Sequence, residues 1–451
     1  MTDRGNFGSK VGVILATAGS AVGLGNVWSF PYITGENGGA AFIVVYALCV
    51  LLLGIPCMVS EFIIGRSAQA NTARAFTKMA DGRPWKWIGY VSVVTGCAIT
   101  CYYAIVSGWC FHYIFASFIS DISTPALVEQ HFTEFSQNPW EPIVWTLGLI
   151  IICHYVITRG VQKGIEKMSK IFMPLLFVLL LVIVVASCML PGAGEGLTFL
   201  FYPDFSKLTP NAVLAAMGQS FYSLSIGMGC VCTYASYFSR QTNLMQTAVQ
   251  ISVLDSAVAI LAGMMIFPAA FAVGIRPDAG ASLVFVTLPN VFNQAFASMP
   301  VVGAVVSVSF YSLLSLAALT SLMSLHEVAT AFVQEETQMT RKKAATVVTV
   351  CAMIIGSFCS LSLGDWDWLK MAGMSLFDFF DYATGQILLP LIGFFTCIFL
   401  GWFGPRDRIR GEFTNNGTYK NHALFRYYLF LIKYLCPIAI ALVFMNQIGL
   451  I

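Results

Sequence analysis

The sequence predicts an all-α membrane protein with eleven transmembrane helices, of which the first and the sixth are discontinuous. Of its 451 residues, 57% are hydrophobic and only 10% are charged, with a mean hydropathy of +0.77. A soluble fold of this length does not bury that much apolar sequence. Apolar runs of spanning length recur along the chain, and glycine and serine collect in the middle of two of them. The net charge of +2 does not indicate nucleic-acid binding.

Each apolar run has about the 20 residues that a helix needs to cross a bilayer. The first run lacks a cleavage site of small residues, so we expect no removable signal peptide. No segment between the runs is long enough for a soluble domain, and residues 1–451 are predicted to form one integral membrane domain. The runs fall at 11–34, 40–65, 87–119, 142–158, 165–190, 211–238, 244–275, 299–333, 344–362, 374–402 and 424–448.

The basic residues predict the orientation. Of the 24 Lys and Arg residues, 21 lie at the N-terminus or near the ends of the even-numbered runs, and only Lys207, Arg276 and Lys370 lie on the other side. By the positive-inside rule the N-terminus is cytoplasmic, and an odd number of spans places the C-terminus outside. The 13 cysteines fall within apolar runs, where cysteine acts as a small hydrophobe, so no structural disulfide is expected.

The first interruption lies between Gly19 and Pro31. Gly19, Gly23 and Gly25 each cost about 1 kcal/mol in a helix interior, and Pro31 limits the second half. Backbone groups freed by the interruption are tolerated only where they face protein or a wet cavity. Free carbonyls suit a small cation, and the N-terminus of a half-helix suits a carboxylate. The alternative is a glycine-rich face that packs against another helix.

The second interruption occupies 218–229, where glycine and serine again collect at mid-membrane depth. Tyr222 and Met228 would supply apolar walls there. A pair of interrupted spans in corresponding halves indicates a transporter with a 5+5 inverted repeat and a site between the two spans. We therefore expect a first repeat at about 10–190, a second at about 211–402 and an extra helix at about 424–448.

Other spans contribute oxygen and charge. Thr320 and Ser321, with the carbonyl of Ala317, form an oxygen-rich patch, although such hydroxyls commonly bond to their own helix. Ionisable residues inside spans are costly and commonly functional. Asp255 has no Lys or Arg near it in sequence and requires a metal ion, a proton or a remote partner. The other acidic residues within predicted spans are Glu61, Glu327, Asp378 and Asp381.

Several motifs resemble the neurotransmitter:sodium symporter family, in particular its bacterial amino-acid members of the leucine-transporter type. They extend over essentially the whole chain and include Gly19-Ser-Ala-Val-Gly-Leu-Gly-Asn-Val-Trp, Lys163-Gly-Ile-Glu-Lys, Thr233-Tyr-Ala-Ser-Tyr and Ala317-Ala-Leu-Thr-Ser. Members of the family usually have twelve spans, and eleven is a familiar bacterial form. The resemblance implies a sodium-coupled secondary transporter in the bacterial cytoplasmic membrane and no enzymatic activity.

The resemblance also implies two sodium sites and a substrate site. The first sodium site would use Ala21, Asn26, Ser223 and Asp255 together with the substrate carboxylate. The second would use Gly19, Val22, Ala317, Thr320 and Ser321. The substrate would contact Ala21, Gly23, Gly25, Ile99, Tyr103, Tyr222, Ser223, Ser225, Met228, Ser321, Ser324 and Leu325.

Two positions bear on specificity. Amine-transporting relatives place an aspartate where this chain has Gly23, so the substrate here should bring its own carboxylate. Asp255 stands where the family usually has Asn, and Ala259 stands where chloride-independent bacterial relatives carry a glutamate. Our hypothesis is that Asp255 supplies the negative charge that chloride supplies elsewhere, so that chloride is not required.

The resemblance implies gates as well. Ser29 replaces the outer-gate Arg, so Asp381 cannot form the usual ion pair. An inner gate would pair Arg4 with Glu335. Further gating residues implied by the resemblance are Phe7 and Tyr237 at the inner gate, and Gly164 and Pro174, whose spacing resembles a device for unwinding the start of the fifth span.

The sequence thus predicts a sodium-coupled symporter for a neutral, hydrophobic or aromatic amino acid that works by alternating access. The alternatives are an amino-acid sensor that does not transport, and a sodium symporter for another small zwitterion. A membrane enzyme would require an acid–base pair or a metal cluster at one face of the membrane, and the sequence contains no candidate for either. A proton-coupled permease would lack the paired hydroxyls of Thr320 and Ser321. The expected partners are the amino acid, sodium and the lipid bilayer, with a monomer or weak dimer as the assembly.

Overall fold

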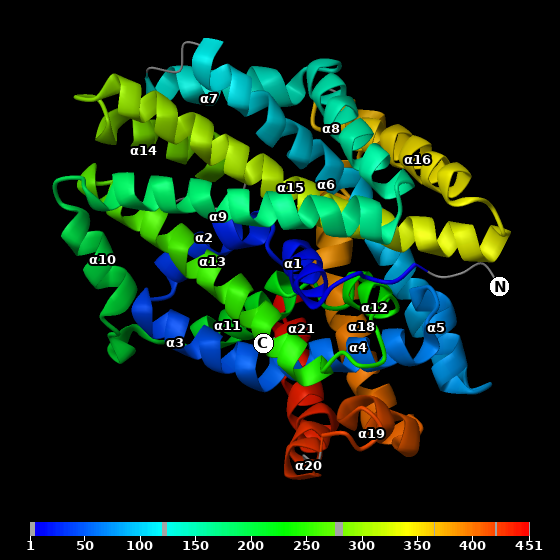
Figure 1. The fold of residues 1–451 in the computed structure, drawn as a ribbon. Helices are drawn as coiled ribbons and strands as arrows, with labels where there is room; N and C mark the ends of the chain where they lie inside the picture. Colours follow the sequence, from blue (N-terminus) through cyan, green and yellow to red (C-terminus); the bar gives the residue numbers. More distant parts are fainter. Residues whose placement is uncertain (1–4, 120–123, 276–282, 365, 420–421, 451) are drawn as a thin grey trace.

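The computed structural model describes residues 5–119, 124–275, 283–364, 366–419 and 422–450. This part of the chain is helical throughout, apart from turns and one isolated bridge between Met371 and Met374. Figure 1 shows long helices packed side by side, with the short helices α1 and α12 in the interior. The all-α prediction is confirmed.

Within the described ranges, nine helices are long and apolar enough to cross a membrane. Several contain a wide, π-type turn, so that one span comprises two α-helices. The spans are α3 and α4 (Ala40–Cys49, Ile55–Ala68), α6 (Trp87–Ile119), α8 (Glu141–Thr158), α9 (Lys167–Cys188), α13 (Leu244–Ala272), α15 (Pro300–Thr337), α16 (Arg341–Leu361), α17 and α18 (Leu376–Asp381, Leu389–Ile398), and α20 and α21 (His422–Phe430, Cys436–Gln447).

The first predicted span is broken. Helix α1 (Lys10–Ala21) begins after Ser9, whose Oγ accepts a hydrogen bond from the Gly12 amide at 3.0 Å. The chain resumes as a π-type turn, Gly25–Ser29, that leads into α2 (Phe30–Glu36). The two parts are bent by 55° and count as one span, which makes ten in the described residues.

The sixth predicted span is broken more completely. Helix α11 (Pro210–Ser223) has 14 residues and α12 (Cys230–Ala235) has 6. Between them Ser225, Gly227 and Gly229 have positive φ values of 53°, 87° and 78°, which end the helix and favour glycine. Neither part is long enough to span alone, so length and composition do not confirm the predicted count of eleven. The predicted discontinuity of helices 1 and 6 is confirmed.

Shorter helices connect the spans. On the predicted outer side, the described part of segment 276–298 forms a buried turn, Leu283–Thr287, followed by α14. Phe285 packs against Trp28 at 6.5 Å and against Trp109 at 5.7 Å between ring centroids, so this segment covers the span that contains the first interruption. Residues 276–282 lie outside the described residues. The connecting helices are α5 (Thr72–Ala80), α7 (Pro125–Gln137), α10 (Ala193–Phe201), α14 (Leu288–Ala295) and α19 (Arg406–Thr414).

The interrupted helices are enclosed by uninterrupted ones. Helix α1 packs against α9, α13 and α15, and α12 packs against α4 and α15. Helix α15 also packs along α6, so the two interruptions and these two long helices meet in the interior. The division into two repeats stays a prediction.

Candidate substrate and cation site

A cavity lies where the two interruptions meet. Protein atoms leave about 470 Å³ of space there, including its opening towards solvent. The lining comes from α1 and the turn after it, from α6, from α11, α12 and the break between them, and from α15. The lining residues are Ser20, Ala21, Gly23, Leu24, Gly25, Ile99, Tyr102, Tyr103, Tyr222, Ser223, Ser225, Met228, Cys230, Ser321, Ser324 and Leu325.

All twelve residues predicted to contact the substrate line this cavity. Four further lining residues, Ser20, Leu24, Tyr102 and Cys230, were not predicted. Ser20 and Leu24 lie inside the glycine-rich motif, and Tyr102 is adjacent to a predicted residue, so proximity in sequence was a usable signal for these three. Cys230 directly follows the second interruption, so the same signal was present for it.

Two glycines of the first interruption allow close approach of the backbone to other side chains. A Cβ atom on Gly23 would lie 2.7 Å from Ser321 Oγ and 3.2 Å from the Tyr103 hydroxyl. A Cβ atom on Gly25 would lie 3.1 Å from Tyr222. An aspartate at position 23 therefore has no room unless Ser321 and Tyr103 move.

Hydroxyl groups join the two interruptions to α15. Ser225 Oγ donates to the Ser20 carbonyl at 2.9 Å, and Ser20 Oγ donates to Ser324 Oγ at 2.8 Å. The Tyr103 hydroxyl accepts from the Leu24 amide at 3.4 Å. Main-chain groups that an intact helix would satisfy internally thus turn towards the cavity, where a polar ligand can compete for them.

The first predicted cation set comes together beside the cavity. Asp255 on α13 is fully buried, and Asn26 and Ser223 are buried next to it. Asn26 Nδ2 donates to Asp255 Oδ1 at 2.8 Å, and Ser223 Oγ donates to Asp255 Oδ2 at 2.7 Å. The fourth member, Ala21, lines the cavity.

Tyr46 on α3 is an additional neighbour of Asp255 that the sequence did not indicate. Its hydroxyl donates to Asp255 Oδ2 at 3.4 Å. In the described residues the hydrogen bonds of the Asp255 carboxylate come from amide and hydroxyl groups, and no Lys or Arg forms an ion pair with it. A buried carboxylate without a basic partner requires a cation or a proton. This arrangement is suited to a small cation.

The second predicted cation set also converges. Ser321 Oγ lies 3.5 Å from the Gly19 carbonyl and 3.5 Å from the Val22 carbonyl. On the same helix, Thr320 Oγ1 donates to the Ala317 carbonyl at 2.9 Å. These five residues present only oxygen atoms, the donor type that hard cations prefer.

Glu61 on α4 has a different environment. Its carboxylate accepts from the Gly227 amide at 2.6 Å and from the Cys232 amide at 3.2 Å. Both amides belong to the second interruption and the start of α12. A carboxylate at a helix N-terminus satisfies free N–H groups and the helix dipole, so Glu61 stabilises the break.

The predicted inner-gate residues are brought together in part. The Phe7 amide donates to the Tyr237 carbonyl at 3.2 Å, and the two rings lie 6.3 Å apart. Glu335 accepts from the Asn71 amide at 2.9 Å. Arg4 lies outside the described residues, so its predicted pairing with Glu335 stays a prediction.

An ion pair that was not predicted, between the half-buried Arg341 and the buried Glu327, lies beside the inner gate. Arg341 Nη2 and Glu327 Oε2 are 2.5 Å apart. The Tyr237 hydroxyl donates to Glu327 Oε1 at 2.6 Å. Glu327, noted in the sequence as a buried charge, is therefore neutralised by a residue 14 positions later, unlike Asp255.

The predicted outer-gate positions have other partners. Ser29 Oγ donates to Gln219 Oε1 at 3.1 Å. Asp381 lies beside the Tyr102 hydroxyl. Ser29 therefore links the first and sixth spans, and Asp381 faces the third span, without the ion pair of the family pattern.

Gly164 and Pro174 bracket the cytoplasmic start of the fifth span. Gly164 lies in a π-type turn, Val161–Glu166, and Pro174 lies inside α9. A Cβ atom on Gly164 would clash with the Val156 carbonyl, which explains the glycine by packing alone. The unwinding role of this pair stays a prediction.

Comparisons with known proteins give one consistent picture. The family model for the sodium:neurotransmitter symporter family matches residues 4–134 and 129–450. An uncharacterized sodium-dependent transporter of Haemophilus influenzae is 35% identical over 460 residues, covering 99% of this chain and 98% of that protein. YhdH of Bacillus subtilis, also described as an uncharacterized sodium-dependent transporter, is 35% identical, with coverage of 99% and 98%. The human sodium- and chloride-dependent GABA transporter 2 is 26% identical, with coverage of 96% and 79%.

A solved structure is similar over almost the full length. The crystal structure of MhsT in complex with L-phenylalanine matches with a TM-score of 0.87 and 40% sequence identity. The match covers 99% of this chain and 100% of that one. The helical arrangement described above is therefore one that is known in an experimental structure.

Proposed function

Because this chain belongs to the sodium:neurotransmitter symporter family, whose members are secondary transporters and not enzymes, we propose that it carries a neutral α-amino acid into the cell together with sodium. The supporting observation is the cavity between the two interrupted helices, which has an oxygen-rich set of residues on each side. Ligands that favour the open and closed states differently would drive alternating access.

The cavity supports a zwitterion with an apolar side chain. Position 23 carries no acidic side chain, and a Cβ atom there would lie 2.7 Å from Ser321 Oγ, so the negative group at this point would come from the substrate. Ile99, Met228 and Leu325 form the apolar part of the wall. The similar protein MhsT was solved with L-phenylalanine, which supports a hydrophobic or aromatic substrate for this chain too.

We propose two sodium ions. The first is held by Ala21, Asn26, Ser223, Asp255 and the substrate carboxylate, so that sodium and substrate bind together. The second is held by the five oxygen-bearing residues between α1 and α15. Each set joins an interrupted helix to an uninterrupted one, and sodium binding therefore stabilises one arrangement of the helices over others.

We also propose that transport is independent of chloride. Asp255 supplies a fixed negative charge beside the first sodium, and its carboxylate carries no ion pair to Lys or Arg in the described residues. Ala259 lies one turn further along α13 and is fully buried, so the position of the family's additional glutamate contributes no charge here.

A bacterial cytoplasmic membrane, a cytoplasmic N-terminus and an outer C-terminus complete the proposal, with the basic residues as its support. A second candidate function is an amino-acid sensor, because a sensor with this fold would have the same binding cavity. Another small zwitterion is the alternative substrate, since Ser324 adds a polar edge to the cavity.

The test has two stages. A thermal-shift screen of the twenty amino acids, with sodium or potassium, should show stabilisation by hydrophobic or aromatic amino acids only in sodium. Proteoliposomes with an inward sodium gradient should then accumulate the best ligand. Binding without accumulation would support the sensor, and binding that is equal in potassium would contradict sodium coupling.

A further inference from the structure

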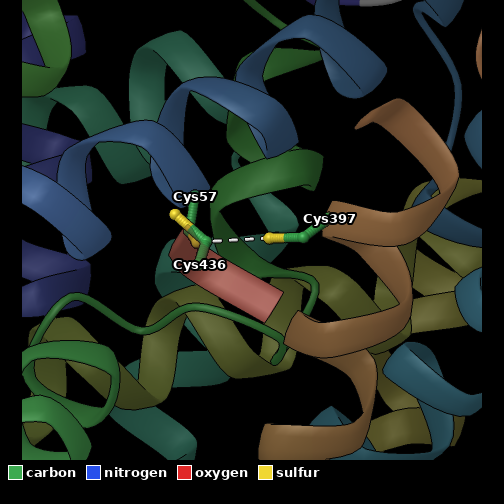
Figure 2. A group of neighbouring side chains, drawn as sticks. All are labelled: Cys57, Cys397 and Cys436. Carbon is green, nitrogen blue, oxygen red and sulfur yellow. Dashed lines mark hydrogen bonds between the residues drawn. The ribbon is translucent and has the colours of Figure 1, made fainter. Parts of the chain in front are cut away.

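Three cysteine side chains converge outside the transport site. Cys57 on α4, Cys397 on α18 and Cys436 at the start of α21 are all buried. Figure 2 shows their side chains close together on three different helices. In the sequence all three fall within apolar runs, where cysteine acts as a small hydrophobe, and 340 residues separate Cys57 from Cys397.

The distances suit a metal ion. The sulfur atoms of Cys57 and Cys397 are 3.5 Å apart, and all three sulfur atoms lie within 4.8 Å of one another. With a metal–sulfur bond of about 2.3 Å, three sulfur atoms around one ion are separated by about 4 Å. The observed arrangement therefore reaches a three-coordinate geometry through small side-chain movements, without moving a helix.

We propose that Cys57, Cys397 and Cys436 form a binding site for one soft, monovalent cation of the copper(I) type. Sulfur ligands select copper(I) over the hard cations of the transport site. Binding converts one thiol to a thiolate: the S–H bond breaks, a sulfur–metal bond forms, and the proton leaves to solvent. One thiolate and one monovalent cation are together neutral, which limits the cost of burial; a divalent ion would need two thiolates.

The surroundings favour a cation site over a disulfide. A disulfide needs two sulfur atoms about 2 Å apart and an oxidant, and it would leave the third thiol without a role. Three convergent thiols match the number of ligands of one ion.

The site would connect helices of different parts of the fold. Cys57 and Glu61 are four residues apart on α4 and share one face of that helix. Glu61 holds the amides of the second interruption, while Cys397 and Cys436 belong to the last two spans. A bound cation would therefore join the helix that supports the break to α18 and α21.

Copper(I) binding by the purified, reduced, full-length protein tests this proposal. Titration against a coloured copper(I) chelator should show one ion per chain. Each of Cys57→Ser, Cys397→Ser and Cys436→Ser should weaken binding at least tenfold. Cys101→Ser is the matched control: Cys101 is also buried, but its thiol bonds to the Cys97 carbonyl at 3.2 Å.

Sodium-dependent substrate binding should persist in all four variants, which checks that each is folded. X-ray absorption of the copper-loaded wild type should show three sulfur neighbours, a result that does not depend on any variant. Equal binding by the wild type and the triple serine variant, or an equal loss in Cys101→Ser, would overturn the proposal. So would a coordination shell without sulfur, or a Cys57–Cys397 disulfide in place of bound metal.

Discussion

Replacing Asp255 with asparagine should make transport depend on chloride. Asn has nearly the same shape as Asp, so Asp255→Asn removes the charge while leaving the buried volume filled. Asn26 and Ser223 both donate to this carboxylate at 2.8 and 2.7 Å. An asparagine can accept only through its single oxygen, so one of these two donated hydrogen bonds is lost, and the proposed sodium loses a full negative charge.

The size of the effect follows from these contacts. A hydrogen bond to a charged group contributes about 1.5–3 kcal/mol. Since 1.4 kcal/mol corresponds to a factor of ten, we expect the sodium concentration for half-maximal uptake to rise about 10- to 150-fold. Chloride, if it enters beside Tyr46 and Ser223, would restore part of the lost attraction for sodium.

The assay is uptake of labelled amino acid into proteoliposomes, in sodium chloride or sodium gluconate. Wild-type uptake should be equal in the two salts, and uptake by Asp255→Asn should be low in gluconate and higher in chloride. Asp204→Asn, which changes an exposed carboxylate outside the spans, is the control and should behave as wild type. Wild-type uptake that stops in gluconate would refute the role of Asp255. Equal uptake by Asp255→Asn in chloride and in gluconate would refute it as well.

Three further predictions use the same assays. Gly23→Asp should lower amino-acid uptake at least 100-fold, because its Cβ would lie 2.7 Å from Ser321 Oγ. Gly385→Ala is the control: no atom lies within 4 Å of its new Cβ, so uptake should not change. Normal uptake by Gly23→Asp would contradict this argument from the geometry. Ser321→Ala should raise about tenfold the sodium concentration needed for half-maximal substrate binding, because the loss of one ligand costs about 1–2 kcal/mol. A sodium titration of substrate binding measures this. An unchanged titration curve would show that Ser321 is not part of the second sodium site. Gly164→Val should lower the melting temperature in detergent, since the new side chain would clash with the Val156 carbonyl and overpacking costs about 1–3 kcal/mol. An unchanged melting temperature would show that this turn adapts to the larger side chain.

Much of the architecture was predictable because it depends on local properties. A hydrophobic run long enough to cross a bilayer has to form a helix, since its backbone groups find no other partners in lipid. Glycine clusters in two of these runs predicted the interruptions, and the motifs of the family predicted twelve of the sixteen residues that line the cavity. The count of eleven spans is not confirmed, because the second interruption leaves pieces of 14 and 6 residues, each too short to span alone.

By itself, the sequence determined that this chain is a helical membrane protein with two broken spans and with oxygen-bearing residues at both breaks. The tertiary structure decided which remote side chains complete each site. Tyr46 meets Asp255 across 209 positions, Arg341 neutralises Glu327 while Asp255 has no such partner, and three distant cysteines converge. Hydropathy and motifs depend on residues that are near one another in the sequence. The partner of a buried charge or thiol depends on how the helices pack, which brings together residues that are far apart in the sequence.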